Sequence, residues 1–599
     1  MRILVFHGYL LHGTGSNVYN ASLAAALAGL GHEVHLLCQD RAPQELGFVD
    51  AAGDWDDGGE LRVRALREPV RCTVYRPALD GLLPVYVADR YEGIEARPFQ
   101  DCSEVEIEAY VAANVRAVRD VVARAAPDVA LANHLVMGPL VLARALGGAG
   151  IPPGGVIAGS CAEHTSPAAS LPDGRRHPPL GGAGIPRRRG AIPYAVKVHG
   201  SALEYTVKPH PRFLPAAREG IASARAVLVG SRHVAESLWA ALDDPGLPAR
   251  TRLGPPGVDV ARFAPREPAP ARAGVAELAA RLAAQAGPVV AAAAGPASDA
   301  DAADTPGPVG ATGAAGEPNP ASAFARDVGE AAAALASVAE GAAAGDRLVA
   351  FVGKLIVSKG VDLLLASWPL VLSAQPRARL VVVGFGAYRA AFERLLAALA
   401  DGDLDAVAAL AAEGRAAEGG PREPLKLLQA FLDGLGDDER ARYLEAARGL
   451  RERVVLTGRL DHDELADLLP ACEALVVPST FPEAFGMVAA EAAACGALPV
   501  CAEHSGLAEV AGALAETVPP EVAPWLAFRT GGGSDPVRAI AARVVAWLAA
   551  PAPLRAATRD AIVATVRERW SWEGVARGVI AAAQGRLGEL PQPAPLDAS

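Results

Sequence analysis

The chain has 599 residues, with 56 Lys and Arg against 68 Asp and Glu, and a formal net charge of −12 at pH 7. Its length predicts two or more domains, and its acidic balance disfavours a nucleic-acid partner, which is bound through positive charge. No stretch approaches the roughly 20 strongly apolar residues of a membrane span, no signal-peptide pattern is visible, and the seven cysteines are scattered. We therefore expect a cytoplasmic protein with free thiols and no membrane span, and we leave peripheral membrane contact open.

The chain opens with a βαβ pattern. Residues 2–6 (RILVF) are typical of a buried strand, an apolar-periodic helix follows, and residues 33–38 are typical of the next strand. The turn before the helix contains Gly13-Thr14-Gly15, whose backbone N–H groups could hold a phosphate. Its spacing is not the dinucleotide fingerprint, so glycines that only shape a tight turn explain it equally well.

The middle of the first half is less regular. Residues 40–100 contain acidic and Gly-rich pieces, and we expect them to be irregular and to shape an acceptor site. A helix is predicted over residues 104–125, with Ser103 as its cap, followed by a strand that ends at Asn133 and His134. Residues 151–191, rich in Pro, Gly and Arg, predict a mobile insertion.

A second histidine follows a strand predicted at residues 195–198. His199 thereby lies at the carboxyl end of a parallel strand, where open α/β sheets bind ligands. A buried histidine bonded to the backbone is the more frequent explanation of an isolated case. The position alone leaves both explanations open.

The centre of the chain differs in composition. Residues 266–345 are mostly Ala, Gly, Pro, Asp and Glu, with two weak helices around 275–287 and 327–341. Few of these side chains can build a core, so we expect a partly disordered linker. Residues 400–445 are a second, charged and helix-prone, insertion.

The second half begins with a strand at residues 348–352 and a glycine turn. Lys354 and Lys359 lie on this turn, ahead of a helix. Two cations at such an edge suit a bound phosphate, although lysines are usually solvated surface residues. Two further strand ends carry Gly384-Phe385-Gly386 and Gly458-Arg459-Leu460.

The most informative stretch is residues 478–510. After an apolar strand and a turn, Glu483 precedes a small-residue helix and Glu491 lies within it. Phe485 and Gly486 present backbone N–H groups without helical partners, which hold hydroxyls and anions well. A helix-dipole acid and a solvated acid would be the ordinary interpretation. The helix is Ala-rich and expected to be buried, however, so an unpaired Glu491 is costly and a ligand is one candidate partner.

The sequence FPEAFGMVAAEAAACGALPV resembles the signature of the retaining nucleotide-sugar glycosyltransferases of family four. That signature runs E-x-F-G, four residues, E, then A-x-x-x-G-x-x-P-V. The resemblance implies an α/β fold of two Rossmann-like domains facing each other across a cleft (GT-B), with C-terminal helices crossing back to the first domain. It implies an acceptor domain over residues 1–265, a donor domain over 346–545, and crossing helices and tail over 546–599.

The resemblance also implies roles for individual residues. His199 and Glu483 would contact the transferred sugar, and Lys354 and Lys359 would hold the diphosphate. Lys354 stands where the family usually has Arg, so bidentate phosphate geometry is lost while the charge remains. Asn17 and His134 would lie in the acceptor cleft. The implied donor-binding residues, with Glu491 on the ribose, are Gly15, Phe485, Gly486, Met487, Glu491, Gly384, Arg459 and Leu460.

The implied reaction moves a hexose-type sugar from a nucleotide-sugar to a small-molecule, lipid or glycan acceptor with retention, using no cofactor and no metal. Fixed cations would neutralise the leaving diphosphate in place of an ion. Two alternatives stay open: another enzyme of this fold, such as an epimerase or a phosphorylase, and a non-catalytic nucleotide-sugar binding protein. A phosphorylase would carry a pyridoxal-binding lysine context, which we do not find, and the full set of charged residues disfavours a decayed site.

Overall fold

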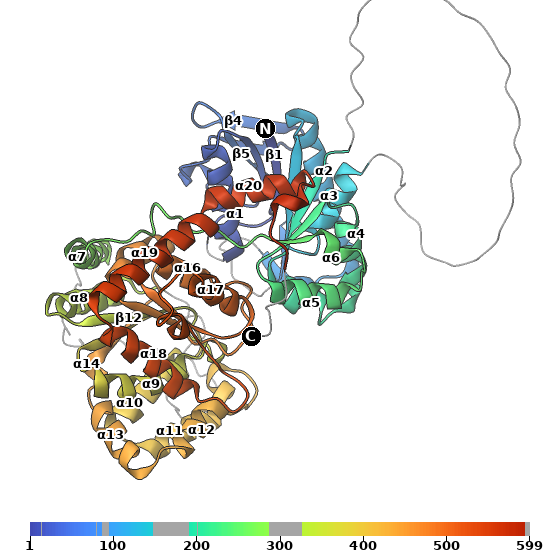
Figure 1. The fold of residues 1–599 in the computed structure, drawn as a ribbon. Coiled ribbons are helices and arrows are strands. Elements are labelled where there is room, and N and C mark those ends of the chain that lie inside the picture. Colours follow the sequence, from blue (N-terminus) through green and yellow to red (C-terminus); the bar gives the residue numbers. More distant parts are fainter. Residues whose placement is uncertain are drawn as a thin grey trace, which may run out of the picture.

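The computed structural model describes residues 1–12, 15–79, 81–86, 95–147, 191–200, 202–286 and 326–593. They form two α/β domains, each built on its own sheet (Figure 1). The insertion expected over residues 151–191 lies outside the described residues except for its last position. Gly13 and Thr14 of the first glycine turn also lie outside them.

The first domain is organised by a nine-stranded sheet. Its neighbouring strands are parallel, apart from one antiparallel pair at the edge, β3 with β4. The central strands are the predicted apolar runs, and they are almost wholly buried because helices cover both faces. In spatial order the strands are β11 (Thr251–Leu253), β10 (Ala226–Val229), β9 (Tyr194–Lys197), β8 (Val129–Asn133), β1 (Arg2–Phe6), β2 (Glu33–Leu37), β5 (Cys72–Arg76), β3 (Ala51–Trp55) and β4 (Leu61–Ala65).

Helices cover both faces of this sheet. The predicted helix α2 begins where expected, because the Ser103 N–H donates to Glu106 Oε2 over 2.8 Å and the Glu106 N–H donates back to Ser103 Oγ. The helices of this domain are α1 (Gly15–Gly29), α2 (Glu104–Ala125), α3 (Gly138–Leu146), α4 (Leu214–Ala222), α5 (Arg232–Leu242) and α6 (Leu247–Arg250).

Residues 40–100 are not irregular as expected. They contribute β3, β4 and β5 to the main sheet, and β6 (Leu82–Val85) and β7 (Glu95–Pro98) form a small sheet of their own. The expectation was wrong because β4 is exposed and its residues (LRVRA) include two arginines, so its sequence lacks an apolar run. β3 and β4 pair with each other as a local antiparallel hairpin, whereas β3 joins the main sheet by pairing with β5, and β5 by pairing with the more distant β2.

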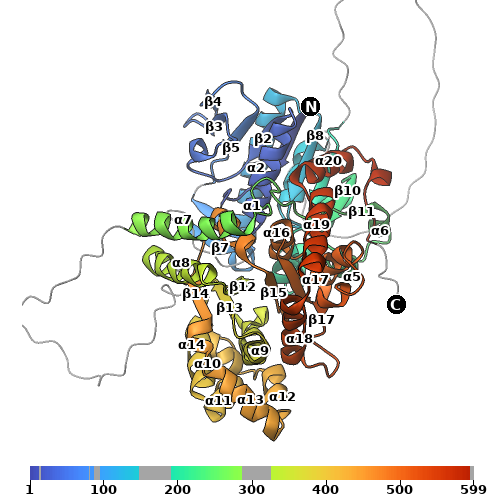
Figure 2. The same cartoon turned by 60° about the vertical axis from the view of Figure 1, so that its left-hand side comes forward.

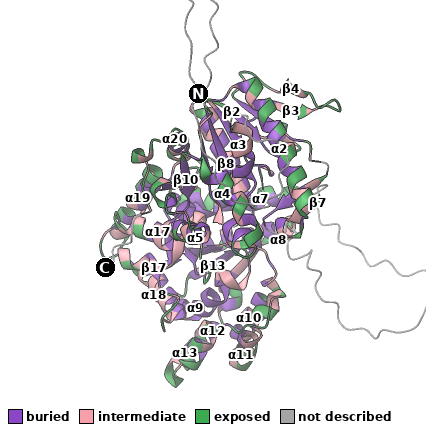
Figure 3. Cartoon of the chain, turned by 90° about the vertical axis from the view of Figure 1, so that its right-hand side faces the viewer, coloured by how far each residue is buried: buried purple, intermediate pink, exposed green. Residues whose placement is uncertain are grey.

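The second domain has a six-stranded, fully parallel sheet. Its core is one continuous cluster of buried apolar side chains, and the buried strands with exposed outer helices are visible in Figure 3. In spatial order the strands are β14 (Val454–Gly458), β13 (Ala378–Val383), β12 (Arg347–Val352), β15 (Ala474–Val477), β16 (Leu498–Ala502) and β17 (Ala527–Phe528).

The helices of this domain include those of the helix-prone segment 400–445. Among the described residues, no single helix is both long and apolar enough to cross a membrane; α18 and α19 reach that length and composition only as a pair bent by 110°. The helices are α9 (Val361–Ala374), α10 (Arg389–Asp401), α11 (Leu404–Glu413), α12 (Lys426–Asp433), α13 (Asp437–Ala447), α14 (Leu450–Arg453), α15 (His462–Leu468), α16 (Met487–Ala494), α17 (Ser505–Ala515), α18 (Pro536–Ala549) and α19 (Ala552–Arg569).

The two weak helices expected in segment 266–345 are present as α7 (Pro268–Ala286) and α8 (Val328–Ala343). They pack on each other, and α8 also packs on β14 (Figure 2). Leu278, Leu282 and Leu335 join the second-domain core, so the expectation that few side chains here build a core does not hold for these helices. Residues 287–325 lie outside the described residues.

The C-terminal helix α20 (Trp572–Ala583) crosses back to the first domain, as predicted (Figure 1). Val579 and Ile580 join the first-domain core beside α1. The two connections between the domains lie together, because the Val258 N–H donates to the Trp570 carbonyl over 2.7 Å. The GT-B arrangement expected from the sequence is therefore confirmed.

Candidate active site

The carboxyl ends of the two parallel sheets meet at the domain junction. Gly200, just beyond β9, and Gly230, just beyond β10, lie against Ala484 of the second domain: a Cβ at Gly230 would be 2.8 Å from the Ala484 carbonyl oxygen. The Arg232 N–H, at the start of α5, donates to Glu509 Oε1 of the second domain over 2.7 Å. The strand ends that carry the candidate residues of both domains are thus brought to one junction.

Glu483 and Lys359 form an ion pair at this junction. They come from neighbouring loops because β12 and β15 are adjacent in the sheet. Their side chains are 23% and 30% exposed, respectively, so both remain within reach of a ligand. Lys354 lies earlier on the same turn and is exposed.

Glu483 is held by residues that the sequence analysis missed. Ser479 Oγ donates to Glu483 Oε1 over 2.9 Å, and the Glu483 N–H donates to Ser505 Oγ over 2.8 Å. His504 Nε2 donates to the Ser479 carbonyl over 2.7 Å, which leaves Nδ1 to accept from the Ser505 hydroxyl at 3.0 Å. The only sequence signal for this support was that His504 and Ser505 follow a strand end.

The start of helix α16 supplies backbone donors beside Glu483. The helix begins at Met487, and its first helical bond runs from the Ala489 N–H to the Gly486 carbonyl over 3.1 Å. Gly486 has φ +122° and a Cβ there would lie 2.7 Å from Leu507, so no other residue fits without strain. Phe485 packs edge-on against Trp570 of the domain connection, with ring centroids 5.4 Å apart.

Glu491 has a protein partner that the sequence analysis did not foresee. Its side chain is 3% exposed and its Oε1 lies 2.7 Å from Nε2 of His462. Burial alone lowers the pKa of His462, but the hydrogen bond and charge of Glu491 outweigh it and raise that pKa above 6.5. The His462 ring also packs against Phe263, with centroids 4.9 Å apart.

The remaining donor-side candidates differ in surroundings. A Cβ at Gly384 would lie 2.0 Å from the Gly353 carbonyl oxygen, so close packing alone requires this glycine. Arg459 lies over the ring of Phe385 at 5.3 Å, and Leu460 is buried beside it. Gly15, at the start of α1, is exposed, and a Cβ on it would meet no atom within 4 Å among the described residues.

His199 lies at the junction in a neutral state. Its Nε2 donates to Asn133 Oδ1 over 3.1 Å, which leaves Nδ1 as an acceptor. Burial lowers the pKa of His199 well below its ordinary value, and the neighbouring His134, Lys197 and His7 lower it further. His199 is therefore suited to accept a hydrogen bond from a hydroxyl near neutral pH.

His134 and Asn17 lie behind His199 in the first domain. His134 is 2% exposed and packs against His199, with ring centroids 5.0 Å apart, and against His7 at 5.7 Å. Asn17 is 1% exposed, and its Oδ1 accepts from His7 Nε2 over 3.0 Å. Both side chains support the cluster from inside, so the acceptor contact predicted for them would require a shift of this packing.

Lys197 is a further buried group that the sequence analysis missed. It is 2% exposed, and its Nζ donates to the Gly254 carbonyl over 2.6 Å, next to the domain connection. Burial lowers its pKa to about 7. Lys197 is the last residue of β9, two positions before His199, and it ties the end of this strand to the connection between the domains.

Aspartates at the Asp-x-Asp spacing that suggests metal ligands are paired with arginines instead. Asp54 pairs with Arg76, and Asp56 pairs with Arg62. Asp401 pairs with Arg451. In the described part of the chain, no group of three or more His, Cys, Asp or Glu side chains is arranged to hold a metal ion.

Comparison with known proteins gives one family match. Residues 427–518 match the model of the family described as "Glycosyl transferases group 1". D-inositol 3-phosphate glycosyltransferase of Segniliparus rotundus is 28% identical over 247 residues, 40% of each chain. The protein of the same name from Streptomyces bingchenggensis is 42% identical over 74 residues, 12% of this chain and 16% of that one. The chain thus matches less than half the length of these curated relatives.

Solved structures resemble the chain more loosely. Sucrose-phosphate synthase from Thermosynechococcus elongatus has a TM-score of 0.48 and 16% identity, covering 98% of this chain and 99% of that one. Anabaena Alr3699/HepE in complex with UDP and glucose has a TM-score of 0.47 and 14% identity, covering 98% and 100%. Both scores are below 0.5. Residues 427–518 are thus similar to the glycosyl transferases group 1 family, and the two α/β domains have the GT-B arrangement.

Proposed function

We propose that this protein transfers a hexose-type sugar from a nucleotide-sugar donor to an acceptor, with retention of anomeric configuration. The ion pair between Lys359 and Glu483, at the junction with the first domain, carries the proposal. The pair places a cation for phosphate and a carboxylate for sugar hydroxyls side by side. The family match supports the class of reaction.

The departing diphosphate gathers negative charge as the sugar bond breaks, and fixed positive partners stabilise it. Lys359, Lys354 and the backbone donors at the start of α16 fill this role. In the ion pair, Glu483 neutralises Lys359. A bound diphosphate would share the ammonium group, and the freed carboxylate lone pairs would accept from the sugar hydroxyls.

The sugar and nucleoside are assigned to separate residues. His199, neutral and with Nδ1 as an acceptor, contacts a sugar hydroxyl from the first domain. Glu491 has one oxygen bonded to His462, and in our proposal its second oxygen binds the ribose hydroxyls. We propose metal-independent transfer, since the lysines supply the charge that an ion would otherwise provide.

A panel of UDP-, GDP- and ADP-hexoses, scored by thermal shift, tests donor binding, because a ligand that binds only the folded state stabilises it by RT ln(1 + [L]/Kd). The donor that stabilises most is then incubated with pure protein, and release of nucleoside diphosphate is measured. Glu503→Gln is the matched control for Glu483→Gln, because Glu503 is a partly exposed carboxylate that pairs with the surface residue Arg529.

We expect one donor to raise the melting temperature and to be consumed slowly even without acceptor. Binding without consumption, in the presence of a broad acceptor mixture, would indicate a binding protein. Isomerisation of the donor sugar with the nucleotide still attached would indicate an epimerase. Either result would contradict the proposal.

A further inference from the structure

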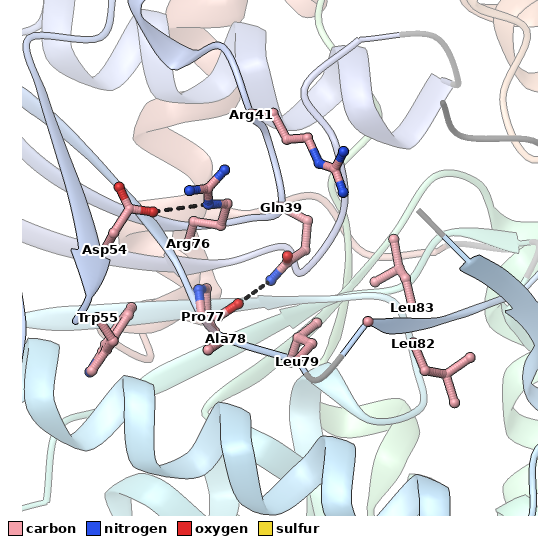
Figure 4. A pocket seen from close by; sticks show the side chains of 11 residues that line it. Gln39, Arg41, Asp54, Trp55, Arg76, Pro77, Ala78, Leu79, Leu82 and Leu83 are labelled. Atoms are coloured by element: carbon pink, nitrogen blue, oxygen red, sulfur yellow. Dashed lines mark hydrogen bonds and ion pairs between the residues drawn. The ribbon is translucent and has the colours of Figure 1, made fainter. Parts of the chain in front are cut away.

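Charged side chains outside the proposed site differ in what they contact. Asp54 and Arg76 border a cavity of about 290 Å³ in the first domain, and they pair with each other over 2.9 Å (Figure 4). Glu418, in the second domain, has a side chain only 10% exposed. Because Glu418 reaches the turn that carries Lys354 and Lys359, it bears on the proposed reaction.

Glu418 binds the start of a helical turn. Residues 353–360, which we call the lysine turn, contain a 3-10 helix over Val357–Lys359. The first N–H of such a helix has no partner within it, and here the Val357 N–H donates to Glu418 Oε2 over 2.8 Å. The other carboxylate oxygen, Oε1, accepts from Arg415 Nε over 3.2 Å. Both oxygens of Glu418 are therefore engaged, and one of them caps the helix.

The lysine turn is also closed by backbone bonds. The Gly360 N–H donates to the Val357 carbonyl over 2.9 Å, so Val357 takes part in holding both the start and the end of the helix. The Ser358 carbonyl accepts from the Thr480 N–H over 2.9 Å. Lys359 lies among these contacts, so its place beside a bound diphosphate depends on where Val357 is held.

The segment that supplies Glu418, residues 400–445, is anchored in the second domain. Its helices α12 and α13 pack on α9, the helix that follows the lysine turn (Figure 2). Phe431 and Tyr443 are buried in the second-domain core, and the Tyr443 hydroxyl donates to the Ala366 carbonyl over 2.9 Å. Glu418 therefore reaches the lysine turn from a packed body.

The charge and the hydrogen bond of Glu418 act on a diphosphate with opposite signs. Burial raises the pKa of Asp362, at the start of α9, to about 7, and the charge of Glu418 contributes to this increase. The carboxylate thus acts electrostatically on groups beside the lysine turn, and by charge alone it would weaken the binding of a diphosphate. By holding the turn at Val357 it would strengthen that binding, so experiment can separate the two effects.

We propose that Glu418 is a positioning residue, which caps the lysine turn at Val357 and so holds Lys359 where its ammonium group meets the leaving diphosphate. The proposal rests on the proposed function, because it takes Lys359 as a partner of the diphosphate. Residues 400–445 thereby act on donor binding through the turn, without contact between Glu418 and the donor.

The test measures, by titration calorimetry, the affinities of UDP, GDP and ADP and of the corresponding monophosphates. For the base that binds most tightly, the ratio of diphosphate to monophosphate affinity reports the contact with the terminal phosphate. Glu418→Ala removes the cap and should lower this ratio about fivefold or more. Glu418→Asp keeps the charge but withdraws the oxygens by one methylene group, and it should lower the ratio as well. Glu418→Gln keeps an acceptor for the Val357 N–H and should retain the ratio within about twofold.

Glu413→Ala is the matched control, because Glu413 lies on the same segment and pairs with Arg394 over 3.2 Å, away from the lysine turn. It should leave the ratio unchanged. Melting temperatures are measured for every variant, since a merely structural role of Glu418 would lower them without changing the ratio. If Glu418→Ala does not fold, Glu418→Asp provides the same comparison.

An unchanged ratio in Glu418→Ala and Glu418→Asp would overturn the proposal. A raised ratio in Glu418→Ala would also overturn it, because the charge would then outweigh the cap. A nucleotide-sugar that is bound and consumed while the ratio does not depend on Glu418 refutes the positioning role alone. A ratio that depends on Glu418 in a protein that consumes no nucleotide-sugar refutes the proposed function alone.

Discussion

His199 in the first domain and His462 in the second both follow the carboxyl end of a parallel strand, yet their surroundings are opposite. His199 bonds to an amide, Asn133, and lies among other imidazoles and Lys197, so burial and these neighbours lower its pKa. His462 bonds to a carboxylate, Glu491, which outweighs burial and raises its pKa. The strand ends of the first domain thus present His199 bonded to an uncharged amide, and those of the second present His462 bonded to a carboxylate. We call the first the uncharged edge and the second the charged edge.

This contrast suits the proposed division of the substrates. Sugar hydroxyls need hydrogen-bond partners without net charge, whereas a nucleoside diphosphate needs cations and a carboxylate for its ribose. At the charged edge, Lys359 is paired with Glu483 and His462 with Glu491. Variants that remove a charge from the charged edge, or add one to the uncharged edge, therefore test the comparison directly.

The largest effect is expected from Lys359→Ala. Loss of the cation leaves the leaving diphosphate without its main fixed partner, and we expect turnover to fall by about 100- to 1,000-fold, as for other electrostatic contacts to developing charge. Lys359→Arg should retain part of the activity because it keeps the charge. Steady-state kinetics with the donor found by thermal shift provide the measurement.

Removal of metal ions by chelation tests whether lysines, rather than a bound ion, neutralise the leaving diphosphate. Turnover should survive excess EDTA in the unaltered protein. Loss of transfer on chelation, with recovery on adding Mg²⁺ or Mn²⁺, would show that an ion rather than the lysines neutralises the diphosphate.

The two carboxylates of the charged edge should separate turnover from affinity. Glu483→Gln should lower turnover about 100-fold with little change in nucleotide affinity, since in our proposal Glu483 contacts the sugar. Glu491→Ala should weaken nucleotide binding about tenfold, because in our proposal it removes a partner of the ribose. Turnover and calorimetric affinity are measured for both, and equal losses of affinity would contradict this assignment.

Asn133→Asp would place a carboxylate beside His199, as Glu491 lies beside His462. A carboxylate 3.1 Å from His199 Nε2 would raise the pKa of His199, as Glu491 raises that of His462. We expect turnover to fall about tenfold at pH 7 and to recover as pH rises and the imidazole loses its proton. Asn133→Ala, which adds no charge, should show no such recovery in the pH–rate profile.

The smallest effect is expected at the other histidine. Because the folded pKa of His462 is raised, its pairing with Glu491 stabilises the protein fully below pH 6.5. That contribution is lost as pH rises through the raised value. The difference in unfolding free energy between the unaltered protein and His462→Gln should be largest near pH 6 and shrink as the pH rises through the raised pKa of His462. A difference that grows with pH in denaturant titrations would contradict the ion pair.

Much of the fold was predictable because its signals are local. Apolar runs placed the strands at residues 2–6 and 348–352, and Ser103 marked the start of α2 as its cap. The signature around Glu483 and Gly486 indicated a strand, a turn and a helix within one short segment. Each of these features depends on residues close together in the sequence, so no knowledge of strand order was needed.

Other features depended on partners far along the chain. β5 joins the main sheet by pairing with β2, and α7 and α8 join the second core by packing on elements of the second domain. The pairs Lys359–Glu483 and His199–Asn133 join residues separated by 124 and 66 positions.

The sequence by itself determined which residue types stand at the strand ends and that the chain has two α/β halves. Tertiary structure alone decided which of those residues meet, and with that the charge of each histidine. The physical reason is that pairing and burial depend on the order of strands in a sheet and on the contact between domains. Neither is encoded in any short stretch of sequence.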